Sequence, residues 1–416
     1  MRVDRRGRVV LVISALLLST ACGSGDAPGA AGATQARDAA TPQASGTKSG
    51  TSSHGEHGDG AEPAPSRAPL RPGESILDLA MPGGAYTPSA RGAAQDEYRC
   101  FLLDPALSED VFVTGAEVLP GTTGIVHHAI VFRVGPADVP VAEQADAGDP
   151  GTGWTCFGDA GLPGRGGGTG AVSALDSAPW LSAWAPGGGE SLFAAGTGVR
   201  LRPGTRLVLQ VHYNLRDGSA PDSSGLRLRL TDGDARLEPL ETMLLVAPVE
   251  LPCAPGEVGA LCERESAVLD LMRRFGPSSG ATVAGLQLLC GGDLLKPRAG
   301  PTQRCDRTVR EPLVVRAVAG HMHLLGRSIR VELNPGTRGA RTLLDRPVWN
   351  FDDQRATPLT TPARVRPGDV LRVTCTHDAR LRGLLPALGD EPPRYVTWGE
   401  GTADEMCLGV VVYTRA

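Results

Sequence analysis

The chain has 416 residues, a formal net charge of −5, nine cysteines and eight histidines. Acidic and basic residues nearly balance, so no basic surface for nucleic acid is indicated and we expect no such partner. The sequence contains no Cys-x-x-Cys pair, which argues against a zinc ribbon or a thioredoxin-like redox site.

The first 22 residues (1–22) are typical of a signal peptide for export. Several arginines precede an apolar run at 9–18, which is too short to span a bilayer. Small residues then lead to Cys22, as in the lipobox of a bacterial lipoprotein, so we predict a lipid anchor at Cys22. Ser19 and Ala21 also suit an ordinary cleavage site. We expect a protein of the cell envelope, on its periplasmic or extracellular face, that meets the membrane only through Cys22.

Residues 23–73 consist mostly of Gly, Ala, Ser, Thr and Pro. Such a segment cannot bury enough apolar surface to offset the entropy of ordering, so it predicts a disordered tether. His54 and His57 within it either bind a divalent metal weakly or are simply solvated. About 340 residues follow, which is more than one hydrophobic core usually organises. We therefore predict two domains, at 74–237 and 238–416.

Short runs that alternate apolar and polar residues recur in both predicted domains. They are bounded by Gly, Pro or Asp and are typical of antiparallel strands; examples are 206–213, 226–230, 328–333 and 369–375. The 55 glycines and 34 prolines suit many tight turns, and only 263–274 shows a convincing helical pattern. We predict an all-β fold of two antiparallel, jelly-roll-like β-sandwich domains in tandem.

Five of the eight histidines fall into three compact motifs. These are Val126-His127-His128-Ala129, Gln210-Val211-His212-Tyr213 and Gly320-His321-Met322-His323. His321 and His323 would share one face of a strand and could close on one metal ion. His127 and His128 point to opposite faces of a regular strand, so both reach one ion only where the strand is irregular. His212 alone is also typical of a hydrogen-bonded core residue. Together the motifs indicate a copper or zinc centre.

Met406 lies in Asp404-Glu405-Met406-Cys407, after a Gly- and Thr-rich loop. A thioether favours Cu(I), although a methionine here is by itself far more typical of core packing. The order HH, QVHYN, HMH and DEMC resembles the catalytic core of the copper type II ascorbate-dependent monooxygenases, the family of peptidylglycine α-hydroxylating monooxygenase and dopamine β-hydroxylase. The resemblance covers about residues 74–416 and includes the segments 96–100, 154–156, 184–187 and 399–407.

The resemblance implies two copper ions per chain. An electron-transfer copper would be bound by His127, His128 and His212. The catalytic copper would be bound by His321, His323 and Met406, which makes these three the catalytic residues. Members of the family use O2 and an external reductant, ascorbate, to hydroxylate a C–H bond. One oxygen atom enters the product and the other leaves as water, so we expect ascorbate or another one-electron reductant as co-substrate.

The eight cysteines other than Cys22 indicate up to four disulfides in an exported protein. The resemblance implies the pairs Cys100–Cys156 and Cys375–Cys407. The remaining four lie in a segment longer than the corresponding region of the family and allow three connectivities. For them we predict Cys253–Cys262 and Cys290–Cys305.

The substrate side departs from the peptide-processing members. There an Arg two residues before the H-x-H pair and polar residues after the Met-Cys bind a peptide carboxylate; here Ala319, Leu408 and Val410 stand at those places. Apolar side chains cannot pair a buried charge, so a glycine-extended peptide is not expected. We predict a small aromatic or aliphatic substrate, unless an arginine elsewhere supplies a charge; the candidates are Arg310, Arg316 and Arg327.

Two other functions fit parts of the sequence. A non-catalytic copper-storage or copper-delivery lipoprotein on the same scaffold would keep the six ligands and also use His54 and His57. A surface or adhesion domain would bury its histidines without metal. His377 shares the strand face of Cys375 and either approaches the catalytic pocket or packs in the core.

Overall fold

The computed structural model describes most of the chain beyond residue 66. The described residues are 67–90, 95–162, 175, 178–389 and 391–416. The predicted signal, Cys22 and the His54 and His57 patch lie outside them. The described residues belong to one compact unit, Ala64–Ala416. Among them, no helix has both the length and the apolar character that a membrane span requires.

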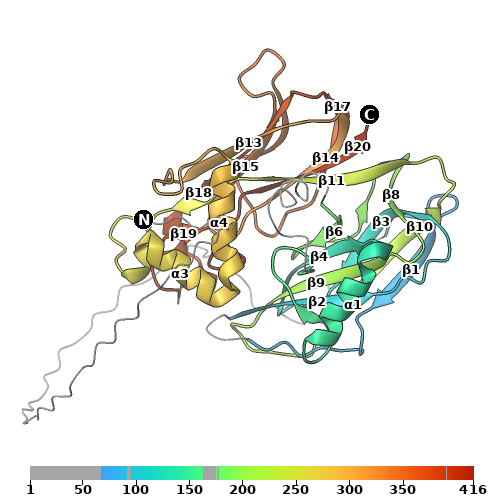
Figure 1. The fold of residues 1–416 in the computed structure, drawn as a ribbon, viewed down its shortest axis with the longest axis horizontal. Helices are drawn as coiled ribbons and strands as arrows, with labels where there is room; N and C mark the ends of the chain where they lie inside the picture. The colour runs from blue at the N-terminus through green and yellow to red at the C-terminus, as the bar shows by residue number, and fades with distance from the viewer. Residues whose placement is uncertain (1–66, 91–94, 163–174, 176–177, 390) are drawn as a thin grey trace, which may run out of the picture. The chain divides into compact units, whose positions relative to one another are not determined.

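Antiparallel sheets dominate the described residues (Figure 1). The largest sheet follows the order β1 (Ser75–Ala80), β10 (Gly225–Asp232), β3 (Val111–Leu119), β8 (Thr197–Leu201), β11 (Glu238–Val246), β20 (Leu408–Arg415), β14 (Leu313–His321) and β17 (Thr357–Val365), with β7 (Ser191–Leu192) paired to β3. The second has the order β5 (Trp154–Thr155), β2 (Asp96–Leu103), β9 (Arg206–Asn214), β4 (Val126–Val134) and β6 (Trp180–Trp184). The third has the order β13 (Thr302–Thr308), β18 (Val370–His377), β15 (Gly326–Leu333) and β16 (Arg341–Arg346); β12 (Glu250–Leu251) and β19 (Val396–Thr397) pair separately.

Two large buried cores lie between sheets. In the N-terminal half, alternate residues of β9 such as Leu209 and Val211 pack with Leu228 of β10. In the C-terminal half, Val331 of β15 and Val373 of β18 pack with residues of β11, β14 and β20. This alternation follows from the two-residue period of a strand, and burial between sheets supplies most of the stabilisation. The predicted all-β sandwich fold is confirmed.

The largest sheet runs through both halves of the unit. Its N-terminal and C-terminal strands join where β8 and β11 pair in parallel, over only the two partners Glu238–Thr197 and Pro239–Gly198. This short junction lies at the predicted domain boundary between 237 and 238. The boundary itself stays a prediction.

Three α-helices accompany the sheets in the described residues. α3 (Arg264–Phe275) corresponds to the helical pattern predicted at 263–274. α1 (Val139–Gly148) and α4 (Pro277–Leu289) were not predicted. α4 contains no charged residue, and its small and apolar side chains do not form a single stripe, so the usual periodic signal is missing. Short 3-10 turns complete the chain: η1 (Pro136–Asp138), η2 (Ala260–Cys262), η3 (Ala379–Gly383) and η4 (Pro386–Leu388).

Four disulfides are present, and their pairings are those predicted. They are Cys100–Cys156, Cys253–Cys262, Cys290–Cys305 and Cys375–Cys407. The first ties β2 to the segment after β5, and the last ties β18 to the residue just before β20. The other two flank the helices, one just before α3 and one just after α4. Each cross-link stabilises the fold mainly by restricting the unfolded chain.

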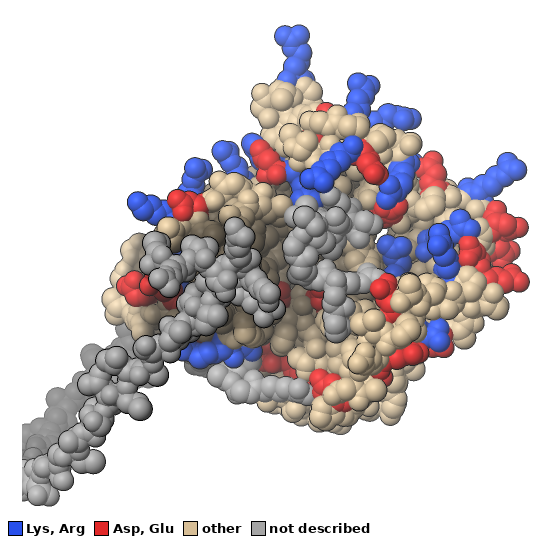
Figure 2. All heavy atoms as spheres, in the orientation of Figure 1, with Lys and Arg blue, Asp and Glu red and all other residues tan. Residues whose placement is uncertain are grey.

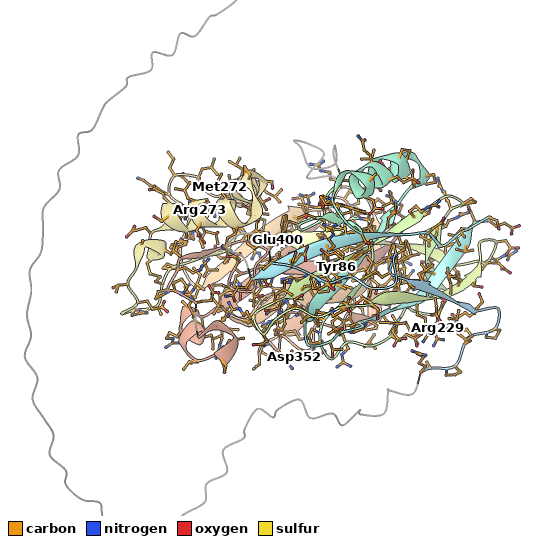
Figure 3. The ribbon with its side chains drawn as sticks, turned by 90° about the horizontal axis from the view of Figure 1, so that it is seen from below. Tyr86, Arg229, Met272, Arg273, Asp352 and Glu400 are labelled. Atoms are coloured by element: carbon orange, nitrogen blue, oxygen red, sulfur yellow. A yellow bond between two sulfur atoms is a disulfide. The ribbon has the colours of Figure 1, made fainter. Side chains whose placement is uncertain are left out.

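The folded part begins upstream of residue 73, where the tether was predicted to end. Arg229, 2% exposed, donates to the backbone carbonyls of Ala68 and Pro69 and pairs with Glu74 and Glu190. Figure 3 shows Arg229 on β10, close to where the described chain begins. Residues 67–73 are therefore held against the first sheet.

Acidic and basic side chains are mixed over the face shown in Figure 2. Ion pairs join neighbouring strands at the surface, such as Arg330 with Asp345 and Arg372 with Asp306. Exposed pairs of this kind contribute about 1 kcal/mol or less each. The buried cores, not these pairs, account for most of the stability.

Candidate copper centre

The first histidine cluster forms where β9 pairs with β2 and β4. In this register His212 lies opposite Tyr98 on one side and His128 on the other. The pairing of β4 with β9 shifts between Val126 and His128. This irregularity removes the strict alternation of faces, so His127 and His128 both approach His212. The irregular strand expected from the adjacent histidines is confirmed.

The ring nitrogens of this cluster have the spacing that one metal ion requires. His212 Nδ1 lies 3.1 Å from His127 Nδ1 and 3.3 Å from His128 Nδ1. An imidazole nitrogen binds a first-row divalent ion at about 2.0–2.1 Å, which places three ligand atoms about 3.3–3.5 Å apart. The three residues also offer ligand atoms that all lie within 4.8 Å of one another. The cluster therefore fits a single bound ion.

These three histidines are uncharged at neutral pH. Burial, together with the neighbouring histidines, lowers the pKa of His127 and His128 well below the usual value. Burial also lowers the pKa of His212, against the opposing effect of Asp96. A metal ligand must offer an unprotonated nitrogen, so the site is ready for a metal without first releasing protons.

Asp96 and Tyr98 hold His212 in place. His212 Nε2 donates to Asp96 Oδ1 at 2.9 Å, and its ring stacks on Tyr98 with the centroids 4.0 Å apart. Burial opposes ionisation of Asp96, but the hydrogen bond from His212 keeps its pKa far below the usual range. Thr402 donates to the same carboxylate oxygen at 2.8 Å. A hydrogen-bonded second nitrogen fixes the orientation of a metal-ligating histidine. The sequence indicated neither role.

The second histidine pair follows the end of β14. His321 Nδ1 donates to Gln354 Oε1 at 2.6 Å, and His323 Nδ1 donates to the backbone oxygen of Asp404 at 3.1 Å. Both Nε2 atoms are therefore left for a ligand. His323 Nε2 is buried and has no hydrogen-bond partner among the described residues. An unsatisfied buried nitrogen is costly, and a metal ion would satisfy it. Burial lowers the pKa of His321 to about 4, so this imidazole is also uncharged.

The strand register places Met406 beside this pair. β20 pairs with β14 so that Leu408 lies opposite His321, and Met406 is two residues before Leu408. In the same loop, Glu405 accepts a hydrogen bond from the backbone N–H of His323 at 2.9 Å. Met406 is buried. The register and this hydrogen bond place the Met406 loop next to the two histidines, and the ligand set of His321, His323 and Met406 stays a prediction.

The buried side chain of Glu405 stabilises this loop by accepting hydrogen bonds from its backbone and from the residues around His323. Its fully buried carboxylate accepts backbone N–H bonds from His323, Leu325 and Met406 at 2.9, 2.6 and 3.1 Å. His377 Nε2 lies 3.4 Å from Glu405 and 3.2 Å from the backbone oxygen of Met406. Burial opposes ionisation of Glu405, yet His377 and the N–H donors hold its pKa below the usual value. His377, which the sequence left open, is therefore a buried support of the loop. The sequence gave no sign of this role for Glu405 beyond its place in the motif.

The two histidine groups face each other across the junction of the sandwiches. The rings of His128 and His321 are 5.9 Å apart between centroids. Phe351, from the loop between β16 and β17, stacks on His127 at 4.9 Å. Asp352, the next residue, is labelled in Figure 3. One loop of the C-terminal half thus contacts the N-terminal cluster directly.

The strand face beside His321 is apolar. Ala319 shares a face with His321 because they are two residues apart, and Ala319 pairs with Val410 of β20. Leu244 of β11 pairs with Val410 on its other side. All three are only partly buried. Arg316, which the sequence left as a possible charge for a substrate, instead pairs with Glu238 and Thr414.

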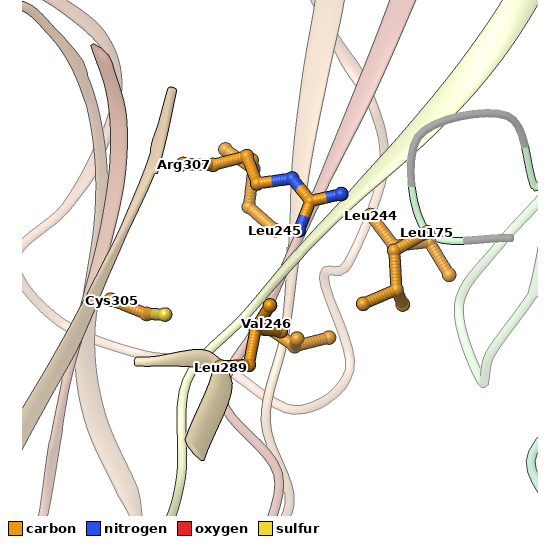
Figure 4. A pocket seen from close by; sticks show the side chains of 7 residues that line it. All are labelled: Leu175, Leu244, Leu245, Val246, Leu289, Cys305 and Arg307. Carbon is orange, nitrogen blue, oxygen red and sulfur yellow. The ribbon is translucent and has the colours of Figure 1, made fainter. Parts of the chain in front are cut away.

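An apolar hollow lies at the far end of this row, where Leu289 of α4 meets Leu244 of the largest sheet (Figure 4). It is lined by Leu175, Leu244, Leu245, Val246, Leu289, Cys305 and Arg307. It has room for no more than about one water molecule. None of the six predicted ligands lines it. We therefore assign it to packing and not to substrate binding.

Glu400 carries an unusual carboxyl group next to the first cluster. Tyr98 donates its phenolic O–H to the backbone oxygen of Glu400 at 2.5 Å. Burial, with a further contribution from Asp404 and Asp159, raises the pKa of Glu400 to about 8. The side chain is therefore largely protonated at neutral pH. Figure 3 shows Glu400 within the folded unit.

This pKa predicts a pH-dependent contribution to stability. An acid whose pKa is raised by folding binds more protons in the native state, so the free energy of unfolding falls as pH rises from about 4.5 to about 8. We expect Glu400→Gln to be more stable than the wild type by about 4–5 kcal/mol at pH 9, and the two to converge near pH 4, below the pKa of an unfolded glutamate. Urea unfolding at both pH values measures the difference. Exposed Glu143→Gln is the control, and an equal response of both variants would contradict the prediction.

Comparisons with known proteins add one informative match. Among solved structures, similar chains include an allantoicase (10% identity, 83% of this chain and 90% of that chain, TM-score 0.18) and a Paenibacillus xanthan lyase (10% identity, 82% and 25%, TM-score 0.18). A third is the infectious bursal disease virus VP2 subviral particle (9% identity, 85% and 75%, TM-score 0.18). TM-scores this low carry no argument. No curated protein matches the chain.

The informative match is to a family model. Residues 301–416 match the copper type II ascorbate-dependent monooxygenase C-terminal domain. The matched range begins just before β13 and includes His321, His323 and Met406. The C-terminal part of the chain is thus similar to the C-terminal domain of the copper type II ascorbate-dependent monooxygenases, which supports the family resemblance.

Proposed function

We propose that this protein is an exported copper-dependent monooxygenase that hydroxylates a C–H bond of a small organic substrate with O2. An external one-electron reductant such as ascorbate would supply the electrons. The observation that carries the proposal is the meeting of two imidazole groups, with His128 and His321 5.9 Å apart between ring centroids. One copper ion would bind at each group.

The residues of each group suit a different task. Three uncharged imidazoles, at His127, His128 and His212, suit an ion that changes oxidation state without binding substrate. The second group adds the soft thioether of Met406 to His321 and His323, a set that favours Cu(I). Bound copper would supply one-electron redox chemistry and activation of O2. The overall reaction would convert R–H, O2, two electrons and two protons to R–OH and water.

The surroundings of the second group favour a substrate without a carboxylate. Ala319, Val410 and Leu244 form an apolar row on the strand face of His321. A buried carboxylate next to this row would lack a partner, which is costly, whereas an aromatic or aliphatic molecule would bury apolar surface. A small, neutral, largely apolar molecule is therefore the class of substrate we propose.

Export and anchoring are part of the same proposal. The support is the pattern of residues 1–22 and the position of Cys22 in it. Four disulfides in the folded part fit an oxidising compartment outside the cytoplasm.

Copper stoichiometry and oxygen insertion test the proposal together. We expect two coppers per chain in the wild type, about one in His321→Ala, and two in a His54→Ala/His57→Ala control, because those histidines are not among the six proposed ligands. Ascorbate-dependent incorporation of label from ¹⁸O2 into product should require Met406, so Met406→Ala should lose it. Substrates for the assay are a panel of small aromatic and aliphatic molecules.

Each outcome has a separate meaning. Two coppers with label insertion that depends on Met406 would support a monooxygenase. Two coppers without insertion over the whole panel would favour copper storage on the same scaffold. A wild type that binds no stoichiometric copper would overturn both readings.

A further inference from the structure

The segment between β12 and β13 contacts the loop that carries Met406. This segment, here called the insertion because the resemblance implies a shorter region in the family, comprises residues 252–301 and contains α3 and α4. At the end of α3, Arg274 donates to the two carboxylate oxygens of Asp404 at 2.6 and 2.9 Å. Their side chains are only 12% and 6% exposed. Two parallel bonds of a guanidinium to a carboxylate fix both distance and angle.

The backbone of the loop also packs directly on α3. A Cβ atom added to Gly399 would lie 2.7 Å from Leu271, and one added to Gly401 would lie 2.9 Å from Arg274 Nη1 and 3.0 Å from Phe275. Real Cβ atoms essentially never approach so closely. The loop follows the helix surface so tightly that these positions have no room for a side chain. The contact of Gly399 with Leu271 adds to the ion pair, whereas Gly401 packs against the ion pair itself.

The helices are themselves firmly anchored. Glu250 of β12 is fully buried and accepts two hydrogen bonds from Arg264, at the start of α3, at 2.6 and 2.7 Å. It also accepts from Gln287 of α4 at 2.8 Å and from Tyr395 at 2.9 Å. Two disulfides close the ends of the insertion. A support held in this way is rigid enough to position a metal ligand.

Asp404, which Arg274 binds through its carboxylate, also contacts the predicted ligand His323 through its backbone. The backbone oxygen of Asp404 accepts the Nδ1–H of His323 at 3.1 Å. The nitrogen that bears the hydrogen bond decides which nitrogen is free for a metal. Here the free one is Nε2, the buried atom without a partner among the described residues.

We propose that Arg274 is a positioning residue for the second copper site. By holding Asp404, it fixes the tautomer and orientation of His323 and the path of the loop to Met406. The inference rests on the proposed function, because it presupposes copper at His321, His323 and Met406. It assigns a role to a segment that the family resemblance leaves unexplained.

The test compares Arg274→Gln with its neighbour Arg273→Gln in the full chain. Arg273 is on the same helix, has a side chain that is 71% exposed and pairs with Asp270 at 3.4 Å (Figure 3). We expect Arg274→Gln to weaken Cu(I) binding at the second site by about 10–100-fold, measured by competition with a Cu(I) chelator. Copper K-edge absorption should show loss of the sulfur contribution. The first site should bind as in the wild type, which also shows that the variant is folded.

Two further variants separate positioning from charge. Arg274→Lys keeps the positive charge but loses the two parallel N–H donors of the guanidinium. We therefore expect a Cu(I) affinity at the second site between those of the wild type and Arg274→Gln. Gly401→Ala should push the loop away from α3 and weaken the second site without altering any charge. Gly285→Ala is the matched control, since a Cβ there would meet nothing within 4 Å.

The outcomes decide between the alternatives. Selective loss at the second site in Arg274→Gln, with Arg273→Gln unchanged, supports the inference. Wild-type affinity in Arg274→Gln, or equal loss at both sites, overturns it, because the residue would then be dispensable or merely structural. A wild type with no copper at the second site would instead refute the proposed function, so the two failures are distinguishable.

Discussion

Replacing Glu405 by Gln should lower the free energy of unfolding by about 3–5 kcal/mol and abolish copper binding at the second site. The carboxylate is fully buried and accepts three backbone N–H groups besides facing His377. An amide has one oxygen and one NH2 group, so at least one backbone N–H would face a donor and lose its partner. Urea unfolding and copper titration measure the two effects.

Glu311→Gln is the matched control for Glu405. Glu311 is 71% exposed and pairs only with Arg415 among the described residues, so its loss should change stability by no more than about 0.5 kcal/mol. If Glu405→Gln proved as stable as Glu311→Gln, the carboxylate could not be the organiser of the loop.

Removing the Cys375–Cys407 disulfide should have the second large effect. The bond closes 32 residues, for which chain entropy predicts about 3–4 kcal/mol of stabilisation. Cys407 directly follows Met406, so the double variant Cys375→Ala/Cys407→Ala should also weaken copper binding at the second site. Thermal unfolding and copper affinity of the purified variant measure both.

The Cys253–Cys262 bond provides the comparison. It closes only 9 residues, so its double alanine variant should lose about 1 kcal/mol less. Its cysteines lie in the insertion and do not adjoin a predicted ligand. Equal copper loss in the two double variants would show that the Cys375–Cys407 bond has no special effect on the Met406 loop.

Sequence patterns predicted the secondary structure well where apolar residues recurred with the period of a strand or of a helix. The alternating runs at 206–213 and 369–375 form β9 and β18, and the apolar spacing at 263–274 forms α3. α4 was missed because its uncharged, small and apolar residues carry no clear period. Arg274 and Asp404 lie 130 residues apart, so no local pattern could reveal their contact.

The amino-acid sequence by itself determined the strand-rich architecture and the ligand motifs, because spacing within a strand and the chemistry of His and Met are local properties. Two disulfide pairs followed from the resemblance, and the other two were one choice among three connectivities. The resemblance to the monooxygenase family also predicted that His127, His128 and His212 group together. Only the tertiary structure decided that both groups meet across the junction and that Asp96, Glu405 and Arg274 hold them. Those contacts depend on register and on burial between distant strands, where a buried polar group must find its partner in space and not along the chain.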